Sequence, residues 1–122
     1  MRILLVDDNE ELLYSLSRIF RNAGFNVVSA PDAESALETL PSEAPDVVLT
    51  DLRLPGQSGL DLLRAVRQVL PRVPVLLVTA YGDEDTRAAA ETHGAFAMLT
   101  KPVLRQELLD NVNRALDEER GK

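Results

Sequence analysis

Short apolar runs recur along the chain and alternate with segments that have helical periodicity. Most of the runs are rich in Val, Ile and Leu, and they cover residues 3–6, 27–30, 47–49, 75–78 and 96–99. The first, third and fourth runs contain no alternating polar positions, a pattern typical of strands that are buried on both faces of a parallel sheet. The pattern therefore predicts five buried or half-buried β-strands.

The segments between these runs place apolar residues on one helical face. In the first of them, Leu12, Leu16, Ile19 and Phe20 share a face, and Gly24 predicts where the helix ends. Four further helices are expected at about 32–41, 60–70, 83–94 and from 104 to the acidic stretch at 117–120. Their expected boundaries are the N-cap residues Asp32 and Asp83 and the terminators Pro41, Pro71 and Gly94.

Strict alternation of strand and helix predicts an α/β fold with a parallel sheet and right-handed crossovers. The 122 residues correspond to one domain, 1–122, because a typical domain has roughly 100–200 residues. The Pro/Gly-containing stretch at 55–59 is expected to be a loop inside this domain.

Composition excludes several classes of function. The chain has no cysteine and a single histidine, His93, which excludes disulfides, thiolate metal sites and multi-histidine metal sites. Twenty acidic and 13 basic residues give a net charge of −7, which disfavours nucleic acid or an anionic membrane as direct partner. The apolar runs are too short for a membrane span or a signal peptide, so the expected location is the cytoplasm.

Reactive side chains follow the predicted strands. Asp7 and Asp8 follow the first strand, Asp51 the third, Thr79 the fourth and Lys101 the fifth. In a doubly wound sheet, ligands bind at the carboxyl ends of the strands, so these side chains are expected to converge. Clustered carboxylates repel unless a cation joins them, and a site rich in oxygen without His or Cys favours Mg²⁺, or Mn²⁺ as a substitute.

The same set of residues suggests phosphoryl transfer. An ammonium such as that of Lys101 suits a phosphoryl oxygen, and the Thr79 hydroxyl can donate to the same group. An aspartate carboxylate is a known covalent acceptor of phosphoryl groups. The pattern therefore predicts Mg²⁺-assisted transfer of a phosphoryl group onto Asp51.

Over essentially its whole length, the chain resembles the response regulator receiver domain of two-component signalling. The motifs that carry the resemblance occur in order, each at the end of its own strand: Val6-Asp7-Asp8, Asp51 with Leu52-Arg53-Leu54-Pro55-Gly56 and Gly59, Thr79-Ala80, and Lys101-Pro102. The resemblance implies a flavodoxin-like fold, a doubly wound five-stranded parallel sheet of strand order 2-1-3-4-5 with helices on both faces. It also implies a cis peptide bond before Pro102.

The resemblance implies a role for each matching residue. Asp51 would accept a phosphoryl group from a phosphohistidine of a sensor kinase or phosphotransfer protein. Asp8, Asp51 and the backbone carbonyl of Arg53 would ligate Mg²⁺ directly, and Asp7 would act through bound water.

The remaining residues would contact the phosphoryl group. Lys101 would pair with Asp51 at rest and with the phosphoryl group afterwards. Thr79 would move toward the phosphoryl oxygen, assisted by the Ala80 backbone N–H. Arg53 and Tyr81 occupy positions that border the phosphoryl group in this family, so they are expected to affect its lifetime in a direction that the sequence leaves open.

One position departs from the family pattern, and one surface suggests a partner. The family usually has Tyr or Phe three residues before the lysine, whereas this chain has Met98, a flexible residue that fills gaps. Activation is then expected to rest on the loop after Thr79 and the helix beyond it.

Leu13 and Tyr14 lie off the main apolar stripe of their helix, either as the edge of the core or as a docking patch for the kinase.

Two other classes of function remain alternatives. A pseudo-receiver would bind partners without phosphorylation, but the full acidic set and Lys101 argue against it. A Mg²⁺-dependent phosphatase with an aspartyl intermediate generally needs a second carboxylate two residues past the nucleophile, where this chain has Arg53. The output is expected to be a changed binding surface on the fourth helix, fifth strand and fifth helix, which could act on an effector domain or form a homodimer.

Overall fold

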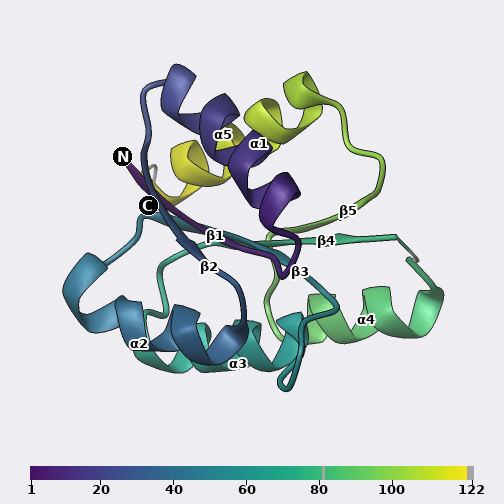
Figure 1. The fold of residues 1–122 in the computed structure, drawn as a ribbon. Helices are drawn as coiled ribbons and strands as arrows, with labels where there is room; N and C mark the ends of the chain where they lie inside the picture. Colours follow the sequence, from purple (N-terminus) through teal and green to yellow (C-terminus); the bar gives the residue numbers. More distant parts are fainter. Residues whose placement is uncertain (81, 121–122) are drawn as a thin grey trace.

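The computed structural model describes residues 1–80 and 82–120, with the side chains of 119 and 120 left aside, and it has the predicted element order. The strands are β1 (Arg2–Val6), β2 (Asn26–Ala30), β3 (Val47–Asp51), β4 (Val75–Thr79) and β5 (Ala97–Thr100). The helices are α1 (Glu10–Asn22), α2 (Ala33–Glu43), α3 (Gly59–Val69), α4 (Glu84–Thr92) and α5 (Arg105–Arg120) (Figure 1). No helix within the described residues is long and apolar enough to cross a membrane.

All strand pairs are parallel and the sheet order is β2-β1-β3-β4-β5, which confirms the predicted topology. The order places β1 beside β3, with Val6 opposite Thr50. On the other side of β3, Asp51 pairs with Val78, and Thr79 pairs with Thr100 of β5. The carboxyl ends of four adjacent strands therefore reach the same edge of the sheet.

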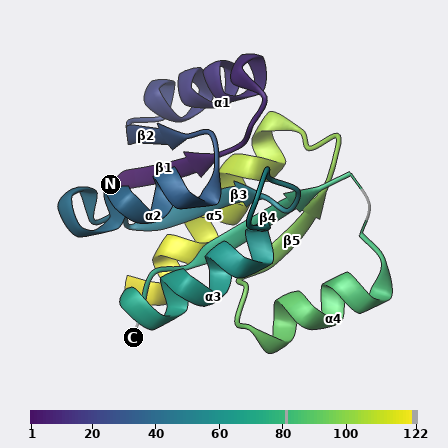
Figure 2. The same cartoon turned by 60° about the horizontal axis from the view of Figure 1, so that its bottom comes forward.

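Helices cover both faces of the sheet, as predicted. Helices α1 and α5 lie on one face and α2, α3 and α4 on the other (Figures 1 and 2). Successive strand residues point to opposite faces, so Leu4 and Val6 pack under α2 and α3, whereas Ile3 and Leu5 pack under α1 and α5. This two-sided burial explains why the β1 run has no polar alternation.

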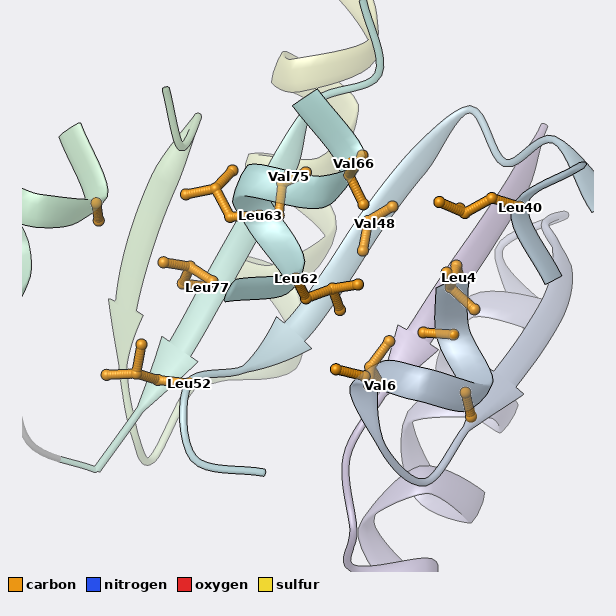
Figure 3. Close-up of a cluster of buried hydrophobic side chains, with 14 residues drawn as sticks. Leu4, Val6, Leu40, Val48, Leu52, Leu62, Leu63, Val66, Val75 and Leu77 are labelled. Atoms are coloured by element: carbon orange, nitrogen blue, oxygen red, sulfur yellow. The ribbon is translucent and has the colours of Figure 1, made fainter. Parts of the chain in front are cut away.

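Each face has its own apolar core. The cluster on the α2–α3 side contains Val48, Leu62, Leu63, Val66, Val75 and Leu77 beside the β1 residues (Figure 3). The cluster on the other side centres on Phe20, whose ring meets that of Phe25 edge-on with centroids 5.4 Å apart. Burial of one large apolar side chain contributes roughly 1.5–3 kcal/mol, so the two cores together fix the positions of the strand ends.

Side-chain caps set most helix boundaries. Asp32 and Asp83 are N-caps whose side chains accept from Ser35 N–H and Thr86 N–H, as the sequence predicts. Gly24 and Gly94 follow α1 and α4 with φ of 95° and 87°, a conformation that glycine adopts without steric cost. The C-cap of α4 is His93, which therefore lies at the end of a helix.

Two predicted helix ends are wrong. Helix α2 continues through Pro41 to Glu43 and ends at Ala44, whose φ is 40°. Pro41 lies in the last turn, where its fixed φ suits a helix and its missing N–H removes only one hydrogen bond. Helix α5 runs through the acidic stretch to Arg120, because Glu and Arg are good helix formers.

Candidate functional site

The topology brings the predicted reactive residues to one edge of the sheet. Asp7 follows β1, Asp51 ends β3, Thr79 ends β4 and Lys101 follows β5. The Lys101 backbone N–H donates to the Thr79 carbonyl at 2.7 Å, so β4 and β5 remain paired up to the site. The convergence expected from the parallel strand ends is therefore present.

Three carboxylates form the centre of the site. One carboxylate oxygen from each of Asp7, Asp8 and Asp51 lies within 4.8 Å of the other two. Asp7 is buried, Asp51 is partly buried and Asp8 is exposed, so the cluster opens to solvent on the Asp8 side. An all-oxygen donor set that keeps access to water suits a hard divalent cation, above all Mg²⁺, which retains several waters when bound.

Lys101 supplies the positive charge next to this cluster. Its Nζ donates a hydrogen bond to Asp51 Oδ2 at 3.1 Å and lies 3.8 Å from Asp7 Oδ2. One ammonium thus lies beside two of the three carboxylates, which leaves an excess of negative charge at the edge of the sheet. The pairing of Lys101 with Asp51 is the arrangement that the resemblance implies for the resting state.

Burial and charge act together on Asp7. Burial is the largest cause that raises the pKa of its carboxyl, and the charges of Asp51 and Asp8 raise it further. The Asn9 N–H donates to Asp7 Oδ1 at 2.9 Å and Lys101 lies nearby, and both lower that pKa in part. A group whose charged form is disfavoured gains from a bound cation, which fits a metal site.

An apolar cavity adjoins the acidic cluster. It has a volume of about 450 Å³, and Leu12, Leu49 and Val78 contribute to its walls, while Asp7, Asp51 and Lys101 line its polar part. The apolar walls leave little polar material on that side of the carboxylates. Apolar side chains therefore border the carboxylates on that side, whereas Asp8 faces solvent.

The loop after β3 folds back onto Asp51. The Arg53 N–H donates to Asp51 Oδ1 at 3.3 Å, and the Gly59 N–H donates to the Leu52 carbonyl at 2.8 Å. A Cβ on Gly59 would lie 2.9 Å from Leu52 Cα and closer still to the Asp51 carbonyl oxygen. Glycine is therefore required where α3 begins directly against the end of β3.

The other predicted residues are placed as follows. Thr79 is buried at the end of β4, and Ala80 is exposed beside it. The Lys101–Pro102 peptide bond is cis, as the resemblance implies. Tyr81 lies outside the described residues.

Met98, at the position where the family usually has an aromatic residue, packs against the core on the α2–α3 side. A Cβ on Gly82 would lie 3.4 Å from its Cε, so Met98 reaches the loop between β4 and α4. Sequence reasoning missed this contact and also the bond from Asn9 to Asp7. The signal for the second is that Asn9, an N-cap residue type, directly follows the acidic pair.

Comparison with known proteins agrees with this geometry. The family model for the response regulator receiver domain matches residues 3–113. The chain is 37% identical over 114 residues to the DNA-binding transcriptional regulator NtrC of Escherichia coli K12, and 40% identical over 113 residues to the response regulator protein FleR of Pseudomonas aeruginosa. Each match covers 93% of this chain but only 24% of the relative, so the chain spans about a quarter of the length of these relatives.

Solved structures give the same result. A CheY-like response regulator receiver domain protein from Methanospirillum hungatei superposes with a TM-score of 0.95 at 31% identity, covering 98% of this chain and 96% of that one. A receiver domain protein from Clostridium thermocellum gives a TM-score of 0.92, also at 31% identity, over 98% and 96% of the two chains. With its acidic pocket at the carboxyl edge of a 2-1-3-4-5 sheet, this chain belongs to the response regulator receiver domain family, whose members are phosphoacceptor domains in signalling.

Proposed function

We propose that Asp51 accepts a phosphoryl group from a phosphohistidine of a sensor kinase or phosphotransfer protein. The observation that carries the proposal is the hydrogen bond of 3.1 Å from Lys101 Nζ to Asp51, inside a cluster of three carboxylates. Asp51 is the carboxylate that both lies in the cluster and accepts the hydrogen bond from Lys101. An attacking carboxylate oxygen and a cation for the developing charge are thereby adjacent.

The residues that would hold Mg²⁺ are Asp8 and Asp51 through their carboxylates and Arg53 through its backbone carbonyl, with Asp7 acting through water. A bound divalent cation would neutralise the carboxylates and the oxygens of the incoming phosphoryl group, which otherwise repel each other. The oxygen-only donor set and the raised pKa of Asp7 support this assignment.

In the proposed transfer, a carboxylate oxygen of Asp51 attacks phosphorus. The phosphorus–nitrogen bond to the donor histidine breaks, its electron pair returns to the imidazole, and an acyl phosphate forms on Asp51. Lys101 then pairs with a phosphoryl oxygen, while the Thr79 hydroxyl and the Ala80 N–H donate to the same group. Attack of water on phosphorus later regenerates the Asp51 carboxylate and releases inorganic phosphate, so any catalysis is on the chain itself.

The proposed output is a change in the surface formed by α4, β5 and α5. Movement of Thr79 toward the phosphoryl group would pull the loop that follows it. Met98 contacts that loop near Gly82, so we assign to its flexible side chain the place that an aromatic residue takes in most members of the family. Arg53 is positioned by its backbone bond to Asp51 and is assigned an effect on the lifetime of the acyl phosphate.

The proposed output partners are an effector domain or a second copy of the chain. The similar regulators are about four times as long as this chain, which supports an effector domain. The net charge of −7 supports a protein rather than nucleic acid as the direct contact of this domain.

The test of the phosphoacceptor is labelling by acetyl phosphate, a small donor that needs no kinase. We expect Asp51→Asn to abolish labelling in the presence of Mg²⁺, and EDTA to abolish labelling of the unaltered chain. Asp110→Asn, an exposed position on α5, is the matched control and is expected to label normally. A single label that persists in Asp51→Asn would show that another residue accepts the phosphoryl group. Turnover of a small phosphate ester would instead favour a phosphatase.

We further propose that the kinase docks against α1 around Leu13 and Tyr14. Leu13 is half-buried, whereas Tyr14 is 64% exposed with the Arg18 guanidinium 6.0 Å from its ring centre. Ala substitution at either position is expected to slow transfer from the kinase by tenfold or so, the effect of a loss of about 1.4 kcal/mol, while labelling by acetyl phosphate is unchanged. Val69→Ala removes an apolar side chain that is 57% exposed at the end of α3, away from α1, and serves as control. Unchanged transfer from the kinase in both α1 variants would refute the docking site.

A further inference from the structure

A second cavity lies at the opposite edge of the sheet from the acidic site. Its volume is about 690 Å³, and three arginines line it: Arg67 on α3, Arg72 in the turn before β4 and Arg114 on α5. Pro74 and Phe96, which precede β4 and β5, mark its position at the amino ends of these strands. A strand of five residues spans about 16 Å, so this cavity is well separated from Asp51.

None of the three guanidinium groups forms an ion pair with a carboxylate in the part of the chain that the structure describes. Glu118 also lines the cavity, but it is not within ion-pair distance of any of them. Arg67 donates to the Val73 carbonyl at 3.5 Å and Arg114 to Asn111 Oδ1 at 2.7 Å, so most of their N–H donors have no protein partner among the described residues. Three arginines without a carboxylate partner in the described part of the chain are unexpected in a domain whose net charge is −7, because acidic side chains are in excess.

Two contacts hold the guanidinium groups in place. A Cβ on Gly94 would lie 3.3 Å from Arg67 Nε, so the absence of a side chain at Gly94 lets Arg67 lie against the backbone. The Arg114 guanidinium lies over the Phe96 ring, 5.6 Å from its centre. Both arginines are therefore oriented before any ligand arrives, which reduces the entropy cost of binding.

Helix dipoles account for only part of this cluster. Arg67 lies in the last turn of α3, where a cation offsets the partial negative charge of the helix end. Arg72 lies in the turn beyond that helix and Arg114 lies more than one turn before the end of α5, so neither is placed for that purpose. The three arginines together bring three positive charges to one cavity, which would suit a ligand with more than one negative charge.

The geometry points to a binding site for a small anion that carries two adjacent phosphate groups. Guanidinium groups bind phosphate oxygens through paired N–H donors, and three of them match a diphosphate better than a single phosphate. The volume lies within the usual range for small-ligand pockets, about 300–1,000 Å³, and the Phe96 and proline side chains offer an apolar wall for an attached organic group.

The test uses inorganic pyrophosphate without Mg²⁺ at low ionic strength, followed by calorimetry and by amide chemical shifts. We expect saturable binding, with the largest shifts at Gly94, Ala95 and Phe96, and an affinity that falls as NaCl is added. Arg72→Gln is the main variant because Arg72 is exposed and its loss should not affect folding. We expect it to weaken binding roughly tenfold, the effect of losing one charge-assisted hydrogen bond.

Arg64→Gln is the matched control, because Arg64 is an exposed arginine of α3 that pairs with Asp61 and does not line the cavity. It is expected to bind pyrophosphate as the unaltered chain does. Equal weakening in the two variants, or shifts centred on Lys101 and Asp51, would overturn the site. Absence of saturable pyrophosphate binding, with or without binding of an acidic peptide, would overturn it as well.

Discussion

Neutralising Asp7 should stabilise the domain in the absence of metal. The pKa of the Asp7 carboxyl is raised in the folded chain, mainly by burial, so the charged form that exists at neutral pH is less favourable in the folded state than in the unfolded one. Asp7→Asn removes that charge. It keeps a side-chain oxygen that can accept from the Asn9 N–H, which donates to Asp7 Oδ1 at 2.9 Å in the unaltered chain. The substitution is therefore expected to raise the free energy of unfolding.

The magnitude follows from the charges around Asp7. A like charge at a separation near 4.8 Å costs about 1 kcal/mol at the dielectric constant of water and about 3–4 kcal/mol at an effective value of 20. The Lys101 ammonium at 3.8 Å is favourable by a similar amount, so it roughly cancels the repulsion from Asp51. Burial and the charge of Asp8 remain as destabilising effects, and we expect a gain of about 1–2 kcal/mol, within the usual range for a single stabilising substitution.

The assay is urea unfolding in EDTA at neutral pH. The expected gain shifts the midpoint upward by roughly 0.5–1 M for a typical m-value. Because the folded pKa of Asp7 is raised, the unaltered chain gains stability as the pH falls through that pKa, and the difference between the two proteins should shrink. If Mg²⁺ binds as proposed, it should add ligand-linked stability to the unaltered chain and less to Asp7→Asn.

Asp110→Asn serves as the control and should change stability by no more than about 0.5 kcal/mol, since Asp110 is exposed on α5. If Asp7→Asn proves less stable than the unaltered chain in EDTA, the reasoning is refuted. Burial and repulsion would then not dominate at Asp7, and its negative charge would be a net structural contribution through Lys101 and Asn9.

Two further substitutions test the loop that carries the site. Gly59→Ala should lower the free energy of unfolding, measured in urea, by more than about 2 kcal/mol, because the new methyl group would clash with backbone atoms of Asp51 and Leu52. Unchanged stability would show that the loop can shift to accommodate the methyl group. Ser58→Ala should lower the free energy of unfolding by about 1 kcal/mol, because it removes the hydroxyl that accepts from the Asp61 N–H at 3.2 Å in the capping box. Thermal unfolding at the same temperature as the unaltered chain would show that the cap does not stabilise α3. The same cap lowers the pKa of Asp61, chiefly through the Ser58 backbone N–H, so Asp61→Asn should destabilise at neutral pH and lose its effect as the pH falls through that lowered pKa.

The fold could be predicted because its signals are local and repeated. Apolar runs without polar alternation identified β1, β3 and β4 as strands covered on both faces, and Asp32, Asp83, Gly24 and Gly94 set helix boundaries by capping chemistry. Pro41 misled the sequence reasoning because a proline in the last turn of a helix removes a single hydrogen bond and need not end it. That distinction depends on how α2 packs, which local sequence does not contain.

The site could be predicted in its membership but not in its environment. Residues that end parallel strands must meet at one edge, so Asp7, Asp51 and Lys101 followed from the topology. That Asp7 is buried whereas Asp8 is exposed depends on how β1 enters the loop before α1, and no pattern in the sequence encodes it. The arginine cavity was missed for a similar reason, because its members come from segments whose proximity is set only by the packing of α3 and α5.

The two cores explain how a cluster of like charges persists in a stable domain, and they indicate which elements would move if Asp51 is phosphorylated as proposed. Strand β1 is clamped from both faces, and α3 has four buried residues, so the repelling carboxylates cannot separate by moving these elements. Helix α4 has only Ala90 buried, and the loop that joins it to β4 begins directly after Thr79. Elements with little buried apolar surface open at the lowest free energy. Charge added at Asp51 should therefore be relieved through Thr79 and α4 rather than through the sheet.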